Sequence, residues 1–135
     1  MHTVDIYVRY CETDAGGHVS NTSYFLYFEE ARTKFFETIG FGPDRRSIHF
    51  IVAQTECDFR AQAYAAQILT VTTKVSRIGT KSYTMAHEIT DTKTGELIAN
   101  GSAVIVCYNF ETEQSEAIPE NLRAILEEQL EPAEL

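Results

Sequence analysis

The stretch RYCETDAGGHVSNTSYFLYFEEARTKFF, residues 9–36, decides the fold of this chain. In its second half, apolar residues recur at spacings of three and four, which is the period of a helix that buries one face. Ser20 or Asn21 can cap the start of this helix, and Gly40 can end it. Further aromatic residues widen its apolar surface beyond the stripe of an ordinary surface helix. The sequence therefore predicts one long helix with a sheet wrapped around it.

Segments typical of β-strands flank this helix in the sequence. They cover residues 4–10, 49–60, 68–78, 81–92 and 96–110. Consecutive strands this close are expected to join as hairpins or meanders, because a parallel crossover needs about a dozen residues or more. A short amphipathic helix is expected to open at Pro119, and the tail after about residue 131 is expected to fray. The prediction is a single α+β domain over residues 1–135, with a five-stranded antiparallel sheet around the long central helix and a short C-terminal helix.

One helix against one sheet leaves the second sheet face and the edge strands uncovered, which is unfavourable for an isolated subunit. Association of two identical subunits relieves both problems. A homodimer is therefore expected, and a monomeric mass in solution would count against it.

The charge of the chain is concentrated near its end. The formal net charge is -9, but residues 111–135 hold eight Glu against the single Arg123, which leaves -2 for the rest. A nucleic-acid partner is not expected, because binding phosphates along a duplex needs a basic face. A small anionic ligand can still find a local basic patch.

The cysteines and the hydropathy pattern bear on the compartment. Cys11, Cys57 and Cys107 are odd in number and form no C-x-x-C pair, so neither a disulfide framework nor a zinc site is predicted. Reduced thiols fit a cytoplasmic protein best. No apolar run approaches the length of a membrane span, so no membrane partner is expected.

A glycine-rich bend directly before the long helix carries a carboxylate, Asp14. Gly16 and Gly17 permit positive φ and close approach of another group. The first amides of the helix have no intrahelical acceptor and favour negative charge. Thioester hydrolysis uses both features: Asp14 can activate water or attack the carbonyl, while the amide of Asn21 stabilises the oxygen that becomes negative. The same residues also fit an ordinary turn in which Asp14 only bonds nearby amides. The spacing of the residues does not distinguish a catalytic Asp14 from a structural one.

Other polar residues near the bend have simpler explanations. His18 is assigned an auxiliary positioning role, since a lone loop histidine is more often a surface or packing residue. Cys11 has no local histidine to activate it and is expected to fill a strand end. Glu30 and Lys34 form a favourable helical pair, whereas Glu29 is a weaker candidate for facing the cavity. The histidines lack ligand spacing, so no metal is predicted.

Two further groups are candidates for binding a ligand. Several aromatic residues are assigned mainly to the core, with one or two expected to line an acyl pocket: Tyr24, Tyr27, Phe28, Phe59 and Tyr64. Arg77 and Lys81 flank a turn between strands, where they can receive phosphates. Charged hairpin ends more often serve solubility alone.

The segment RYCETDAGGHVSNTSYFLYFEEAR resembles the signature of hotdog-fold acyl-CoA thioesterases of the 4-hydroxybenzoyl-CoA thioesterase type. The matching positions are Asp14, Gly17, His18, Val19, Asn21, Tyr24, Tyr27, Phe28 and Glu29. The later strands fit the same fold over nearly the whole chain. The resemblance implies a long helix wrapped by an antiparallel sheet, two subunits joined edge to edge, and active sites at their interface.

The resemblance also assigns roles within this sequence. It implies that Asp14 is the catalytic carboxylate, that the amide of Asn21 forms the oxyanion hole, and that Lys81 and Ser82 of the KSY segment hold coenzyme A phosphates. Residues expected to contact substrate are Gly17, Tyr24, Tyr27, Phe28 and Phe59. The expected enzyme hydrolyses an acyl- or aroyl-CoA without a cofactor or metal, as a homodimer or a dimer of dimers.

This sequence departs from the family pattern in two places. Gly79 and Thr80 stand where several relatives have more basic residues. Gln62 and Ala66-Gln67 stand where relatives often have a proline and then an acidic pair before the third strand. Two alternatives remain open from the sequence. One is a hotdog protein that binds acyl-CoA without hydrolysing it, and the other is an enoyl-CoA hydratase that uses His18 with Glu29.

Overall fold

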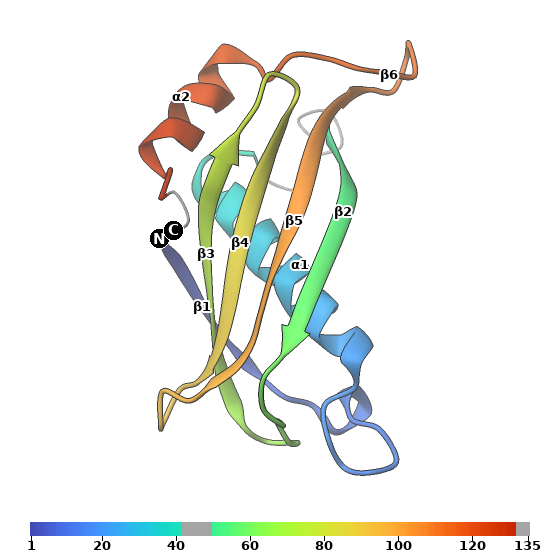
Figure 1. Ribbon diagram of the computed structural model, residues 1–135, viewed down its shortest axis with the longest axis vertical. Coiled ribbons are helices and arrows are strands. Elements are labelled where there is room, and N and C mark those ends of the chain that lie inside the picture. Colours follow the sequence, from blue (N-terminus) through green and yellow to red (C-terminus); the bar gives the residue numbers. More distant parts are fainter. Residues whose placement is uncertain (42–49, 132–135) are drawn as a thin grey trace.

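The computed structural model describes residues 1–41 and 50–131. One curved antiparallel sheet packs against the long helix α1, and the shorter helix α2 lies at one end of the sheet (Figure 1). The elements in chain order are β1 (His2–Tyr7), a 3-10 turn (Tyr10–Glu12), α1 (Asn21–Thr38), β2 (Phe50–Phe59), β3 (Ile68–Ile78), β4 (Ser82–Asp91), β5 (Leu97–Asn109), β6 (Gln114–Ser115) and α2 (Glu120–Glu128). The predicted α+β architecture is confirmed. His49 and the tail after residue 131 lie outside the described residues.

The strand order is β1-β3-β4-β5-β2, and all neighbouring strands are antiparallel. The meander prediction is confirmed for β3, β4 and β5. It is wrong for β2 and β3, which are consecutive in sequence but are separated in the sheet by β4 and β5. Their link, residues 60–67, crosses the end of the sheet, and Val19 N donates to Ala63 O in this link at 2.8 Å. This hydrogen bond to the loop before α1 thus helps to hold the link, which takes the place of a hairpin turn between β2 and β3.

Two details of the strands differ from the prediction. The first strand ends at Tyr7, because Glu12 N donates to Arg9 O at 3.0 Å and Arg9 N donates to Glu12 Oε1 at 2.8 Å, which closes the 3-10 turn. Tyr10 is therefore 85% exposed instead of facing the core. A sixth strand, β6, adds a two-residue pairing to β5 after a turn in which Glu113 has φ 57.

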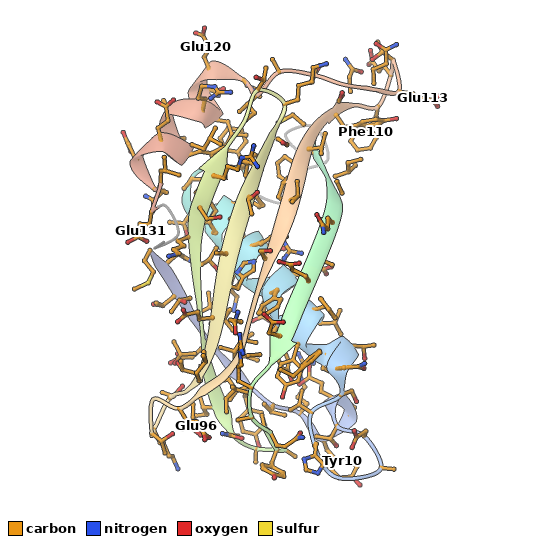
Figure 2. The ribbon with its side chains drawn as sticks, in the orientation of Figure 1. Tyr10, Glu96, Phe110, Glu113, Glu120 and Glu131 are labelled. Atoms are coloured by element: carbon orange, nitrogen blue, oxygen red, sulfur yellow. The ribbon has the colours of Figure 1, made fainter. Side chains whose placement is uncertain are left out.

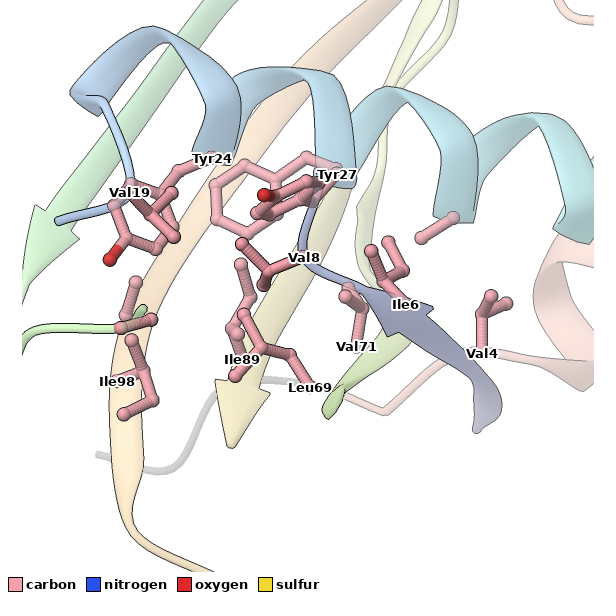
Figure 3. Close-up of a cluster of buried hydrophobic side chains, with 14 residues drawn as sticks. Val4, Ile6, Val8, Val19, Tyr24, Tyr27, Leu69, Val71, Ile89 and Ile98 are labelled. Atoms are coloured by element: carbon pink, nitrogen blue, oxygen red, sulfur yellow. The ribbon is translucent and has the colours of Figure 1, made fainter. Parts of the chain in front are cut away.

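The face of the sheet toward α1 holds the core. In β3, Leu69, Val71 and Val75 are fully buried and alternate with partly exposed residues, as the period of two requires. Side chains from β1, α1, β3, β4 and β5 meet in one buried cluster below the first half of α1 (Figure 3). A second cluster lies under the end of α1 and includes Leu122 and Leu126 of α2. The long helix is thus fixed along its length.

The edge strand β2 is covered far less. Its residues are exposed or partly exposed on both faces, including Ile51 at 40% and Val52 at 48%. Its outer edge has no partner strand among residues 1–41 and 50–131. A long, partly apolar open edge is a site where another chain can pair.

In the part of the chain that the structure describes, neither helix has the length and apolar character needed to cross a bilayer.

Candidate active site

Asp14 lies on a tight turn that is closed by hydrogen bonds between backbone groups. Thr13 and Val19 form an antiparallel bridge, Asp14 N donates to His18 O at 2.8 Å, and Gly17 N donates to Asp14 O at 3.0 Å. Gly17 has φ +81, a conformation that favours glycine. Gly16 N donates to Asp14 Oδ1 at 2.8 Å, which is the bond that an ordinary turn would make. This bond orients the Asp14 carboxylate.

The start of α1 is tied to the same region. Ser20 N and Ser23 Oγ both donate to Glu12 O, each at 2.9 Å. Ser20 is extended, with φ -64 and ψ 144, so Asn21 is the first helical residue. Its N–H cannot bond within the helix, and among the described residues it has no acceptor. The amide of Asn21 is therefore available to a ligand.

Asp14 and Asn21 line one pocket of about 620 Å³. Tyr24 and Phe59 form another part of its wall, and their rings meet edge to face with centroids 5.4 Å apart. Four of the residues predicted for the site are thus brought together from the turn, from α1 and from the end of β2. Burial is the main cause that raises the pKa of Tyr24, so its hydroxyl stays protonated at neutral pH.

Other predicted residues lie beside this pocket or below it. Gly17 and His18 belong to the turn but not to the pocket lining, and the His18 ring packs against Tyr64 with centroids 5.2 Å apart. Tyr27 is buried, and its hydroxyl donates to Glu12 Oε1 at 3.2 Å. Phe28 is fully buried in the core. Contacts of these four residues with substrate stay predictions.

Lys81 and Ser82 lie at the opposite end of the sheet. The turn between β3 and β4 is next to α2, whereas the loop before α1 is at the far end of the molecule (Figure 1). Figure 2 gives the same view with Glu120, at the start of α2, and Tyr10, near the Asp14 turn, at opposite ends. Within one chain, Lys81 and Asp14 are therefore not in one site.

The minor candidates have ordinary surroundings. Lys34 Nζ donates to Glu30 Oε2 at 2.9 Å, which confirms the helical pair, and Glu29 is exposed. Cys11 is exposed in the 3-10 turn, so the expectation that it fills a strand end is wrong. All three cysteines are free.

Sequence reasoning missed part of the pocket. Its wall also includes Ser20, Thr22, Arg60, Ala61 and Gln62. Residues 60–62 belong to the link that crosses the sheet end, so no local pattern connects them with the Asp14 turn. The only sequence signal there was the departure at Gln62 from the family pattern.

The arrangement combines a carboxylate with a free backbone donor and partly apolar walls. Such a site can bind a carbonyl oxygen at the amide and present a base or nucleophile to the carbonyl carbon. Within residues 1–41 and 50–131 there is no group of three or more His, Cys, Asp or Glu able to hold a metal ion. That the protein works without a metal stays a prediction.

Comparison with known proteins places this geometry in a family. The family model described as thioesterase-like superfamily matches residues 8–126. The chain belongs to this superfamily. The residues that match the family model include Asp14, the start of α1 and every strand from β2 to β6.

Three relatives illustrate the thioesterase-like assignment. A predicted thioesterase from Bacillus stearothermophilus has a TM-score of 0.91 and 32% identity, with 98% of each chain covered. The long-chain acyl-CoA thioesterase FadM of Escherichia coli is 28% identical and covers 91% of this chain and 95% of its own length. A thioesterase from Thermus thermophilus, solved with coenzyme A and Zn, has a TM-score of 0.82 and 29% identity and covers 93% and 96% of the two chains. The hotdog fold predicted from the sequence is confirmed.

Proposed function

We propose that this protein is an acyl-CoA thioesterase, which converts an acyl- or aroyl-CoA and water into the free acid and coenzyme A. One observation carries the proposal: the same pocket is lined by Asp14, which carries a carboxylate, and by Asn21, whose amide has no acceptor among the described residues. The names of two relatives support the substrate class, since one is a long-chain acyl-CoA thioesterase and the other was solved with coenzyme A.

The reaction follows from the two groups. The thioester carbonyl oxygen accepts a hydrogen bond from Asn21 N–H, which stabilises the negative charge that develops on it. Asp14 takes a proton from water, and the water oxygen forms a bond to the carbonyl carbon. The carbon–sulfur bond then breaks, and the departing thiolate takes the proton from Asp14. The acid and the thiol leave, and the carboxylate is regenerated.

A covalent route uses the same atoms. Asp14 attacks the carbonyl carbon and expels the thiolate, which leaves an acyl–aspartyl anhydride that water then hydrolyses. A single turnover in ¹⁸O-water can reveal the covalent route. When water attacks the aspartyl carbonyl carbon, the anhydride route leaves label in the Asp14 carboxylate, whereas the general-base route leaves all label in the acid product.

The acyl group is proposed to lie against the aromatic wall of the pocket. Phe59 is 51% exposed although its ring contacts Tyr24, so an apolar surface is open to a ligand beside the two reacting groups. Covering this surface with an acyl or aroyl group removes apolar area from water. No cofactor is needed in this scheme, since water is the second reactant.

A homodimer is proposed from the open edge of β2. Two copies that pair these edges antiparallel extend one sheet across both subunits, with opposite ends of the two subunits side by side. The partner's Lys81 turn then lies toward the same end as Asp14, which a single chain does not achieve. A dimer of dimers and a cytoplasmic location belong to the same proposal, and the free cysteines favour a reducing compartment.

The proposal is tested by measuring thiol release from a panel of acyl-CoA thioesters of increasing length and from an aroyl-CoA. Release of free coenzyme A at rates well above the uncatalysed rate supports it. Loss of enoyl absorbance without thiol release would instead indicate a hydratase. Binding of acyl-CoA without any turnover would identify a binding protein. Light scattering at micromolar concentration tests the dimer.

A further inference from the structure

The C-terminal segment holds the turn between β3 and β4 through a set of hydrogen bonds. Arg123 Nη2, from the first turns of α2, donates to Gly79 O at 2.6 Å and to Thr80 O at 3.4 Å. Ile118 N donates to Thr80 O at 3.0 Å, and Cys107 N donates to Lys81 O at 2.9 Å. Three consecutive carbonyl groups of the turn therefore face β5 and the segment that follows it.

These bonds determine what the turn presents on its other side. The peptide bonds of the described chain are trans, so each N–H points opposite to the carbonyl of the preceding residue. With the carbonyls of Gly79 and Thr80 directed toward the C-terminal segment, the amides of Thr80 and Lys81 are directed away from it. Gly79 N donates to Ser82 O at 2.7 Å and closes the turn. The outer side of the turn thus offers the amides of Thr80 and Lys81, and the Lys81 side chain is exposed to solvent.

A row of donors beside a cation is suited to an oxyanion such as a phosphate. The turn has this character only while its carbonyls stay inward, because a rotated peptide would present an acceptor to the anion. Arg123 bonds two of the three carbonyls, and it is half-buried between α2 and the turn. It is also the single basic residue among residues 111–135, which hold eight Glu. Without Arg123, the charges of this segment would only repel an anion.

We propose that Arg123 is a positioning residue for the phosphate groups of coenzyme A: it fixes the two peptide planes that carry the Gly79 and Thr80 carbonyls, so that the Lys81 turn presents donors to the phosphates. This inference rests on the proposed thioesterase function and on the proposed homodimer, in which the Lys81 turn of one subunit lies toward Asp14 of the other. It assigns helix α2 a part in substrate binding, at the end of the subunit that lies far from its own Asp14.

The test compares two substrates that carry the same acyl group, an acyl-CoA and the corresponding pantetheine thioester, which has no phosphate. Arg123→Gln removes the donated bonds and keeps most of the side-chain length. We expect the KM for acyl-CoA to rise about tenfold, which corresponds to the loss of roughly one hydrogen bond to a charged group. The kcat for both substrates and the KM for the pantetheine thioester should stay within about twofold of wild type, since a change confined to phosphate binding leaves the reacting groups in place.

Two further variants separate positioning from general stability. Lys93→Gln removes a positive charge from the exposed β4–β5 turn and should change neither KM. Lys81→Gln should raise the KM for acyl-CoA, and adding Arg123→Gln to it should raise the KM little further, because both changes act on one site. If Arg123→Gln does not fold, Arg123→Lys takes its place. Its single ammonium cannot reproduce the guanidinium contacts, so an increased KM for acyl-CoA alone is expected.

Equal increases of KM for both substrates, or no increase for acyl-CoA, would overturn the inference while leaving thioesterase activity intact. If the wild type hydrolyses neither thioester, the proposed function fails, and calorimetric titration with coenzyme A itself decides the inference. Weaker binding of coenzyme A by the Arg123 variant than by wild type and Lys93→Gln supports it. Equal binding, or no binding to any of them, overturns it.

Discussion

The ring of Phe28 on α1 stacks on the ring of His87 on β4, with centroids 4.9 Å apart and an angle of 12° between the ring planes. Arg32 Nη1 lies 3.3 Å from His87 Nε2, and Thr73 Oγ1 lies 3.0 Å from His87 Nδ1. Since the guanidinium can only donate, Nε2 accepts and the neutral ring carries its proton on Nδ1. The helix and the sheet are therefore joined by a buried histidine that must stay uncharged.

This relationship predicts how stability depends on pH. Burial, with a smaller contribution from Arg32, lowers the pKa of His87 to about 3. Between about 6.5, the unfolded value, and about 3, the unfolded chain binds a proton that the folded protein does not. The free energy of unfolding should therefore fall as the pH is lowered, by up to about 1.4 kcal/mol per unit from this residue. Urea unfolding at pH 7, 6 and 5 should show a smaller decrease for His87→Gln than for wild type, and equal decreases would contradict the assignment.

The packing of Phe28 also requires a glycine in strand β5, Gly101. A Cβ added to Gly101 would lie 2.7 Å from Phe28 Cε2 and would also meet the backbone carbonyl of Glu56. Gly101→Ala should therefore lower the free energy of unfolding by about 3 kcal/mol, since the backbone cannot yield as a flexible side chain can. The matched control is Gly95→Ala, which has positive φ and open space and should cost only about 1 kcal/mol. Similar costs for the two changes, measured by urea unfolding, would disprove the close contact.

The Asp14 turn has little room at Gly16. An added Cβ would lie 3.3 Å from Asp14 Oδ1 and 3.1 Å from His18 Cδ2, so Gly16→Ala should displace the carboxylate. The kcat for thioester hydrolysis should fall about tenfold or more, because small misplacements of a reacting group are costly. The melting temperature should change little in this exposed turn. Ala15→Ser, one residue earlier, is the control and should keep near wild-type kcat.

The role of the Asn21 amide can be separated from that of its side chain. Proline is well tolerated at the first helical position, and extended Ser20 suits the residue before a proline. Asn21→Pro should therefore fold but lower kcat by about a hundredfold, because it removes one oxyanion donor. Asn21→Ala keeps the amide and should change kcat only a few-fold. Equal kcat values for the two variants would rule out the amide as the oxyanion donor.

Much of the fold follows from local patterns. Helix α1 was predicted because its apolar spacing, its start near Ser20 and its end before Gly40 are all encoded within one stretch. The alternation of β3 likewise identifies the side that faces the helix. The position of β2 beside β5 was not predicted, because strand order depends on contacts between residues far apart in the sequence. The short strand β6 has too few residues to show any period.

The candidate site was predictable only in part for the same reason. The turn of Asp14 and the start of α1 adjoin each other in sequence, so their meeting could be expected. Residues 60–62 reach this pocket through a link whose path the sequence does not reveal. Periodicity places Phe28 on the buried face of α1, but it cannot separate the pocket from the core. Nor does it tell at which end of the sheet Lys81 lies.

The central claim is that Asp14 carries the hydrolysis. Its most direct test is the kcat of Asp14→Asn with the acyl-CoA that the wild type hydrolyses fastest, followed by release of free thiol, with circular dichroism to verify folding. We predict a properly folded variant whose kcat is lower by about a hundredfold or more, the usual scale for losing a catalytic base. A folded variant that releases thiol at a rate close to wild type would contradict the account.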